Sequence, residues 1–232
     1  MIKNKNRVGR FTSSEIYKLL GTPKGRTTYI ESKIHERRIG KSIGKAVYKK
    51  EMAWGKFMEI VVFDLLGLKY RITSKETTLH PKLGDIWSGS VDLLAPREKI
   101  GEIKAYQYDK HCRYADCLRK KDVKLLKKLF PQEYWQLVSN SIIHRVKVAE
   151  AIAYMPYESE IPEIKKMVDQ YEGEDLFDYK WILDADDEDL PSLPDKGYYD
   201  NVTTFEFVVP VEDIILLTEA VIKAGEELKI AK

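Results

Sequence analysis

Residues 88–104 constrain the fold of this chain most, because they read as two short strands joined by a tight turn at residues 96–99. Asp92 lies in the first strand, while Glu102 and Lys104 lie two residues apart in the second. Side chains alternate across a strand, so Glu102 and Lys104 point to the same face. The partner strand can bring Asp92 beside them.

Two carboxylates and a lysine on one face make a site for a hard divalent cation and a phosphate. An Asp, a Glu and a Lys near a turn are also common on solvated hairpin surfaces, so the pattern alone leaves both interpretations open. Apolar residues alternate with the charged ones in both strands, namely Val91, Leu93, Ile100 and Ile103. The charged face is therefore expected to lie against other parts of the protein.

The length and pattern of the chain predict one domain of the α/β (α+β) class, covering residues 1–232, with a central mixed sheet flanked by helices. Helices come first, strands follow, and a strand and a helix close the chain. The first expected element is a short helix capped at Thr12, Ser13 or Ser14 and ended by Gly21. Further helices are expected over 27–47 (interrupted by Gly40 and Gly44), 48–66 (ended by Gly67), 108–129, 132–144 and 211–230. Strands are expected over 69–72, 86–94, 99–106, 146–155 and 203–209.

Charge is distributed unevenly along the chain. Residues 1–50 carry fourteen Lys and Arg against three Glu, whereas residues 156–200 carry fifteen Asp and Glu against four Lys. A basic region suits a polyanion. Alternatively, both regions are solvated, or they pair with each other within or between subunits. The acidic residues 158–200 are expected to form a partly irregular insertion, with part of it a flexible loop.

Membrane and secretion signals are missing from the sequence. It starts without the apolar stretch of a signal peptide, and no apolar run approaches the roughly 20 residues that cross a bilayer. Cys112 and Cys117 are the only cysteines, so a disulfide framework is not expected and a reducing cytosol fits. We therefore expect a cytoplasmic protein with no membrane partner.

Five short motifs, in order, carry a resemblance that spans nearly the whole chain. They are Arg7-x-Gly-x-x-Thr-x-Ser14-Glu, Ala53-Trp-Gly-Lys-x-x-Glu59, Ser90-x-Asp92, Glu102-x-Lys104 and Tyr134-Trp-Gln136. Together they resemble the PD-(D/E)xK nuclease superfamily, and more narrowly the phage lambda exonuclease type, also called the YqaJ-like viral recombinase family. The resemblance implies a fold with a restriction-endonuclease-like core. The chain departs from the family pattern in having Val91 instead of proline before the Asp, a Tyr-to-Gln spacing shorter by one residue, and Val138 in place of a second Gln.

The resemblance implies a nuclease that depends on Mg²⁺, with Mn²⁺ as a substitute. Asp92 and Glu102 would be the central ligands, with the backbone carbonyl of Ile103 as a further ligand. Glu59 would join from its helix, through water or at a second metal. Glu59 lies within an apolar run, which argues against an exposed glutamate without a function, because a buried carboxylate needs a partner.

Lys104 would stabilise the attacking hydroxide and the charge that develops on the phosphate. Nearby metal and burial would also favour a lowered pKa of the Lys104 amine and a role as a base, and the sequence does not separate these roles. Gln136 would orient the water or Lys104, although an amide on the helix surface fits equally well.

The resemblance also implies a pocket for a 5′-terminal phosphate. Its residues would be Arg7, Thr12, Ser14, Ser90 and, near a further basic position, Lys110. A guanidinium and hydroxyls at a helix start suit a phosphate, and Thr12 and Ser14 could equally cap the helix. The aromatic residues Trp87, Tyr106, Tyr108 and Trp135 either stack on unpaired bases or belong to the core.

The function implied is an exodeoxyribonuclease that digests one strand of duplex DNA from its ends, 5′ to 3′, in phage recombination. Its expected partners are duplex DNA ends, a single-strand annealing protein and further copies of itself in a ring trimer, in the cytoplasm of a bacterial host. The alternatives are a related endonuclease, or a non-catalytic DNA-binding module on the same fold. An iron–sulfur nuclease is disfavoured because the chain has only two cysteines.

Overall fold

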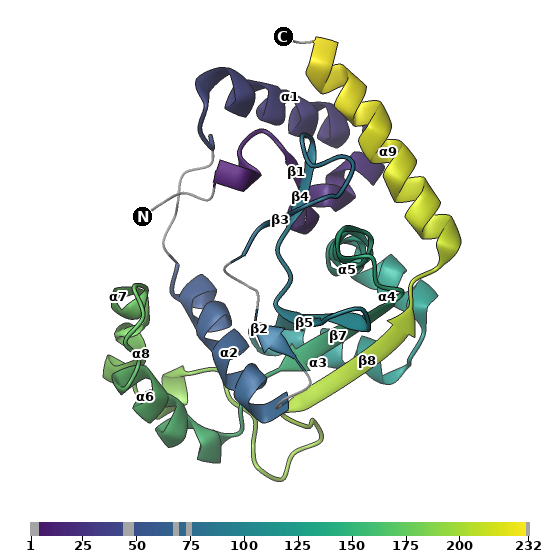
Figure 1. Cartoon of the computed structure of the whole chain (residues 1–232). Coiled ribbons are helices and arrows are strands. Elements are labelled where there is room, and N and C mark those ends of the chain that lie inside the picture. The colour runs from purple at the N-terminus through teal and green to yellow at the C-terminus, as the bar shows by residue number, and fades with distance from the viewer. Residues whose placement is uncertain (1–4, 44–48, 67–69, 73–75, 231–232) are drawn as a thin grey trace.

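The computed structural model of the chain describes residues 5–43, 49–66, 70–72 and 76–230, and it shows helices on both faces of a central sheet (Figure 1). This sheet has the strand order β2-β5-β6-β7-β8. Its strands are β2 (Arg71–Ile72), β5 (Leu93–Ala95), β6 (Lys99–Lys104), β7 (Val148–Tyr154) and β8 (Val202–Val208). Strands β6 and β7 run parallel and the other neighbours antiparallel, so the predicted mixed sheet is confirmed.

A second, smaller sheet corrects the strand predicted over residues 86–94. The structure divides that stretch into β4 (Trp87–Gly89) and β5, which belong to different sheets. Strand β4 lies between β1 (Phe11–Thr12), to which it is parallel, and β3 (Thr78–Leu79), to which it is antiparallel. Residues 90–92 cross from one sheet to the other, so Asp92 lies outside regular ladder pairing.

The predicted hairpin is confirmed as the antiparallel pair β5–β6, with Leu93 opposite Gly101 and Ala95 opposite Lys99. Strand β6 continues three residues beyond Gly101, whereas β5 begins at Leu93. The backbone N–H of Ile103 therefore faces no strand partner on this side. It donates instead to the Asp92 carboxylate, at 2.8 Å. A side chain thus continues the ladder at the place where the strand stops.

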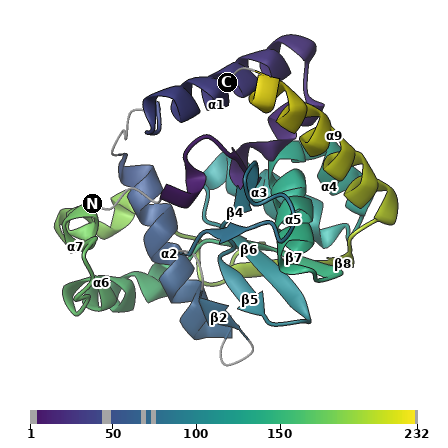
Figure 2. The same ribbon diagram turned by 45° about the horizontal axis from the view of Figure 1, so that its top comes forward.

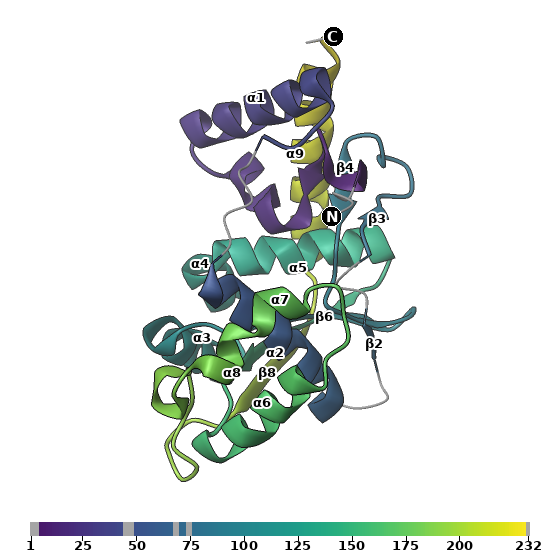
Figure 3. The same cartoon turned by 90° about the vertical axis from the view of Figure 1, so that its left-hand side faces the viewer.

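Most of the helices lie on one side of the large sheet. They are α3 (Tyr108–Arg119), α4 (Val123–Leu129), α5 (Pro131–His144) and α9 (Val211–Ile230), together with the 3₁₀-helix η2 (Ser13–Leu20) and α1 (Pro23–Ile39). Figures 2 and 3 show α5 between the sheet and the N-terminal elements, with α1 and α9 side by side beyond it. Arg26 of α1 and Glu227 of α9 form an ion pair at 2.6 Å.

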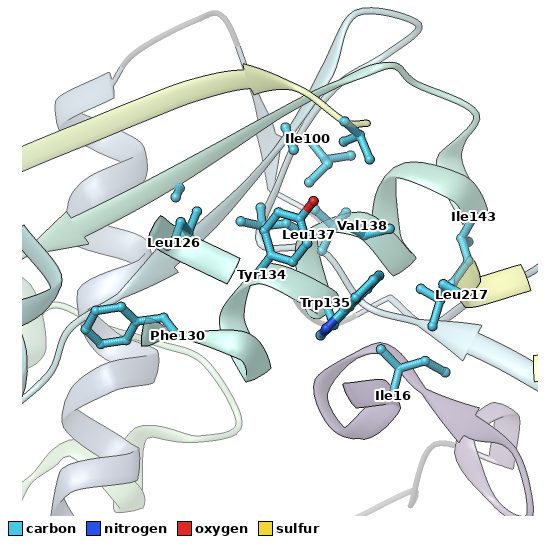
Figure 4. Packing of buried hydrophobic residues seen from close by; sticks show 14 of the residues in the cluster. Ile16, Ile100, Leu126, Phe130, Tyr134, Trp135, Leu137, Val138, Ile143 and Leu217 are labelled. Atoms are coloured by element: carbon cyan, nitrogen blue, oxygen red, sulfur yellow. The ribbon is translucent and has the colours of Figure 1, made fainter. Parts of the chain in front are cut away.

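The core on this face is built around α5. Its buried side chains include Tyr134, Leu137 and Val138, which are fully shielded from solvent. Figure 4 shows them among Ile16 of η2 and Leu217 of α9, with residues of the sheet alongside. Because α5 is packed on several sides, its polar residues are held in fixed positions as well.

Two predicted helices differ from expectation. The stretch 108–129 is broken between α3 and α4, because Lys121 has φ +51° and the Asp122 side chain accepts hydrogen bonds from the first turn of α4. Helix α1 ends at Gly40, which has φ +69°. The predictions for Gly44, for Gly67 and for the first residue of the strand over 69–72 fall outside the described residues.

The opposite face of the sheet is covered by α2 (Lys50–Leu66) and by the acidic insertion. The insertion, predicted to be partly irregular, contains η4 (Glu158–Glu160), α6 (Ile161–Asp169), α7 (Leu176–Tyr179), α8 (Trp181–Asp184) and η5 (Asp187–Asp189). Residues 170–175 and 190–201 belong to no helix or strand. Its helices gather beside α2 (Figure 3). Apolar residues spaced through the acidic run, including Ile164, Val168 and Ile182, are buried against α2 and the sheet.

None of the helices in the described ranges is long and apolar enough to span a bilayer.

The insertion generates a stability prediction. Ile182 is fully buried, whereas Phe177 in the same insertion is 85% exposed. We expect Ile182→Ala to lower the free energy of unfolding by about 2–4 kcal/mol and Phe177→Ala to change it by less than about 0.5 kcal/mol. Urea titration followed by circular dichroism measures both. Equal midpoints for the two variants would show that the insertion does not pack as described.

Candidate active site

The candidate site is centred on the Glu102 carboxylate, which is 1% exposed. Gln136 Nε2 donates to Glu102 Oε2 at 2.6 Å, and Asn140 Nδ2 donates to Glu102 Oε1. Lys104 Nζ lies 3.7 Å from Glu102 Oε2 and donates to Gln136 Oε1 at 3.2 Å. Gln136 and Asn140 share one face of α5 because they are four residues apart. The sheet therefore supplies the charges, and one helix face supplies the amides that hold them.

Asp92 meets this group from the link between the two sheets. Its carboxylate accepts the Ile103 N–H. In a strand the N–H and C=O of one residue point to the same side, so the Ile103 carbonyl faces the side on which Asp92 lies. Burial raises the pKa of Asp92, against the opposing effects of the Lys104 charge and the Ile103 N–H.

The two carboxyl groups influence each other directly. Burial raises the pKa of Glu102 well above its usual value, and the negative charge of Asp92 raises it further, while Lys104 and the Asn140 amide act in the opposite direction. Two buried carboxylates close together are unfavourable unless positive charge compensates them. Lys104 supplies one such charge, and a cation between the pair would supply more.

Lys104 carries a pKa above its usual value. Burial acts to lower this pKa, but the carboxylates of Glu102, Asp92, Glu59 and Glu133 together outweigh burial. The sequence analysis favoured a lowered pKa for the Lys104 amine. The surrounding protein groups instead raise this pKa and favour the charged ammonium. Glu59 approaches from α2, on the opposite face of the sheet, and it acts on Lys104 at the last residue of β6.

The oxygen atoms of the site are the candidate ligands of a metal ion. In the described part of the chain, no three His, Cys, Asp or Glu side chains are arranged to hold one ion together. The compact donors are thus Asp92, Glu102 and the Ile103 carbonyl, all oxygen atoms. This set fits Mg²⁺, which commonly takes one or two carboxylates and keeps several waters. Glu59 fits a contact through water better than direct ligation.

The residues of the predicted phosphate pocket are placed less uniformly. Arg7 donates to Ser14 Oγ at 3.4 Å, so these two lie together. The Ser90 carbonyl accepts from Asn140 at 2.9 Å, which connects Ser90 to the Glu102 site. Thr12 is only 4% exposed, and its side chain makes no capping hydrogen bond to η2. Helix capping therefore does not explain the threonine at this position.

Lys110 contacts other residues than the serines do. Its Nζ donates to Glu133 Oε1 at 3.0 Å and sits 3.7 Å from the centre of the Tyr106 ring. Of the four aromatic residues expected either to stack on unpaired bases or to belong to the core, Trp87 and Trp135 are buried in the core. Tyr108 is 49% exposed.

Two polar residues of the site were missed by sequence reasoning. Asn140 lies one helical turn after Gln136, and this spacing was the available signal. Glu133 lies three residues before Gln136, on the same helix, and it is 4% exposed. A glutamate in the first turn of a helix is ordinary in sequence, so only its burial reveals it.

Comparison with known proteins shows the fold. No family model matches the sequence, and no curated protein matches it either. The structure is similar to the alkaline exonuclease LHK-Exo from Laribacter hongkongensis, solved in complex with dAMP, with TM-score 0.65 and 14% identity over 97% of this chain and 91% of that chain. It is also similar to a phage-related exonuclease from Haemophilus somnus 129PT, with TM-score 0.57 and 13% identity over 94% and 93% of the two chains.

These likenesses cover nearly the full length of each chain. At this level of identity the comparisons establish the architecture alone. The exonuclease-like fold predicted from the five motifs is confirmed, and the roles of the individual site residues stay predictions.

The contact between β4 and α5 generates a second stability prediction. A Cβ atom at Gly89 would collide with Asn140 Oδ1 and Ser13 Oγ, whereas a Cβ at Gly55 of α2 would meet no atom within 4 Å. We expect Gly89→Ala to destabilise the fold by about 1–3 kcal/mol and Gly55→Ala to stabilise it by about 0.5–1 kcal/mol. Thermal unfolding of both variants measures this, and a Gly89→Ala protein as stable as the parent would contradict the close approach.

Proposed function

We propose that this protein is a metal-dependent nuclease that digests one strand of duplex DNA from its ends, in the 5′ to 3′ direction. One observation carries the proposal: Asp92, Glu102 and Lys104 converge at the end of β6, beside the amides of α5. The fold shared with two exonucleases supports the same class of activity.

Asp92, Glu102 and the Ile103 carbonyl would hold Mg²⁺, with Mn²⁺ as a substitute. When bound, the ion supplies a Lewis acid for the scissile phosphate and lowers the pKa of a bound water. Glu59 would hold a water on the side of α2. The carboxylates would stay in position because Gln136 and Asn140 fix one and the Ile103 N–H fixes the other.

Lys104 would act as a fixed positive charge beside the reacting phosphate. Its ammonium is oriented by Gln136 and kept protonated by the surrounding carboxylates. It would therefore stabilise the negative charge that grows on the phosphate in the transition state. A base role for Lys104 would need the carboxylate charge to be offset first.

Direction would come from capture of the strand end. Arg7 and Ser14 lie together at the start of η2, and Ser90 is tied to the catalytic group through Asn140. A guanidinium with hydroxyl groups suits a terminal phosphate. Holding a 5′-phosphate there would place a bond of the same strand at the carboxylates.

The biological setting is a proposal of the same kind. A single-strand annealing protein would take up the strand left by digestion, in phage recombination in the bacterial cytoplasm. Further copies of the chain would form a ring, as a trimer. Light scattering at micromolar concentration measures this assembly, and a monomer would count against the ring.

The activity itself can be tested on linear duplex DNA with Mg²⁺. We expect the protein to release nucleotides from 5′-labelled strands before 3′-labelled ones and to leave closed circular duplex intact. Asp92→Ala removes a ligand worth several kcal/mol of charge stabilisation, so digestion should fall by about a hundredfold or more. Cleavage of the circle would indicate an endonuclease. Salt-sensitive binding without cleavage would indicate a non-catalytic DNA-binding module.

The missed residue Asn140 gives a sharper test of the site. Asn140→Ala removes one of the two amides that hold Glu102, and we expect activity to fall about 10–100-fold, the usual cost of losing a partner of a metal ligand. Asn201→Ala is the matched control, because Asn201 Nδ2 donates to the Glu160 carboxylate at 3.0 Å in the insertion. Initial rates across a Mg²⁺ titration would separate the two. Equal rates for both variants would argue against a role for Asn140.

A further inference from the structure

A buried carboxylate outside the proposed metal site, that of Glu133, connects one aromatic and one basic side chain. Glu133 accepts hydrogen bonds from the Tyr106 hydroxyl and from Lys110 Nζ, the latter at 3.0 Å. Lys110 Nζ also lies 3.7 Å from the centre of the Tyr106 ring, where a cation is attracted to the ring face. Lys110 is thus held from two directions by Glu133 and Tyr106.

This arrangement keeps Glu133 charged. Burial opposes ionisation, but the hydrogen bonds from Tyr106 and Lys110 outweigh it and lower the pKa of the Glu133 carboxyl. The Glu133 side chain is 5% exposed, while that of Lys110 is 49% exposed. A lysine ammonium has three donors. Lys110 can therefore use one donor on Glu133 and present others to an acceptor in solvent.

The location links this group to the rest of the site. Glu133 lies in the first turn of α5, next to Gln132, which donates to the Ser14 carbonyl at 3.4 Å. Ser14 in turn accepts from Arg7. The guanidinium and the Lys110 ammonium are therefore anchored, through different neighbours, to the same helical turn. Tyr106 lies two residues after Lys104, the last residue of β6, so the group lies near that end of the strand.

We propose that Glu133 is a positioning residue which, with Tyr106, fixes the Lys110 ammonium for contact with a phosphate at the 5′ end of the bound strand. The inference deepens the proposed nuclease function and rests on it. A free lysine side chain loses rotamer entropy when it binds a ligand. The contacts with Glu133 and Tyr106 restrict Lys110 before a ligand binds, so its contact with a phosphate would cost less entropy.

A purely structural role for Glu133, as a buried partner of Tyr106, makes a different prediction. Such a role would change how much protein is folded, and hence the overall binding or rate, without changing the preference between two ligands. The ratio of affinities for duplexes with a 5′-phosphate and a 5′-hydroxyl is therefore the informative readout, because the folded fraction cancels in it.

The experiment measures binding of the full chain to fluorescent duplexes with a recessed 5′ end, phosphorylated or not, in a chelator that prevents cleavage. We expect the parent to prefer the phosphorylated end and Glu133→Gln to reduce that preference by about tenfold, the size of one hydrogen bond to a charged group. Glu163→Gln is the matched control, since Glu163 pairs with Lys166 at 3.3 Å on the exposed surface of α6.

Variants of Lys110 complete the test. Lys110→Met should lower the preference as Glu133→Gln does, and adding Glu133→Gln to it should change nothing more, because both act through one ammonium. Lys110→Arg should retain much of the preference. Tyr106→Phe, which keeps the ring and the Glu133 charge, should lower it less and serves if Glu133→Gln fails to fold.

Three results would overturn the inference: a parent without preference for the phosphorylated end, an unchanged ratio in Glu133→Gln, or additive effects in the double variant. Failure of the nuclease proposal looks different. In that case the parent would leave linear duplex undigested with Mg²⁺, whatever its end preference in the binding assay.

Discussion

The structure depends on the burial of one carboxylate, that of Glu102, beneath α5. A carboxylate removed from water is costly unless hydrogen bonds and opposite charge surround it. Gln136, Asn140 and Lys104 provide these contacts, and they do so only while α5 lies against this face of β6. The apolar residues that fix α5 in the core therefore also fix the chemistry of the site. Stability and candidate function share the same helix.

The position of Asp92 follows from a mismatch between two strands. The C-terminal end of β6 extends beyond the point where β5 begins, so the Ile103 N–H has no partner in β5. It donates to the Asp92 carboxylate instead. A longer β5 would satisfy that N–H with backbone and would have no need of the side chain. The break between the two sheets is thus what brings the second carboxylate to the first.

The sequence was sufficient for features that depend on local periodicity. Alternation placed Glu102 and Lys104 on one face, and helical patterns located α2, α5 and α9 closely. It was insufficient where the outcome depends on distant partners. The switch of sheets at residues 90–92, the pairing of Lys110 with Glu133 and the folding of the acidic insertion are decided by tertiary contacts, which no local pattern carries. Asn140 is an intermediate case. The sequence shows that it lies four residues after Gln136, but it does not show that its amide donates to the Glu102 carboxylate.

The geometry of α5 bears on how a cut would be placed. Glu133 and Asn140 are seven residues apart, which corresponds to a rise of about 10 Å along the helix axis. A strand end held at the first turn and a phosphodiester held at Glu102 would be separated by a length that the rigid helix sets. Because α5 is packed on several sides, this length cannot adjust to the substrate. In the proposed function, the packing of the core would therefore fix the distance between the held strand end and the bond at Glu102.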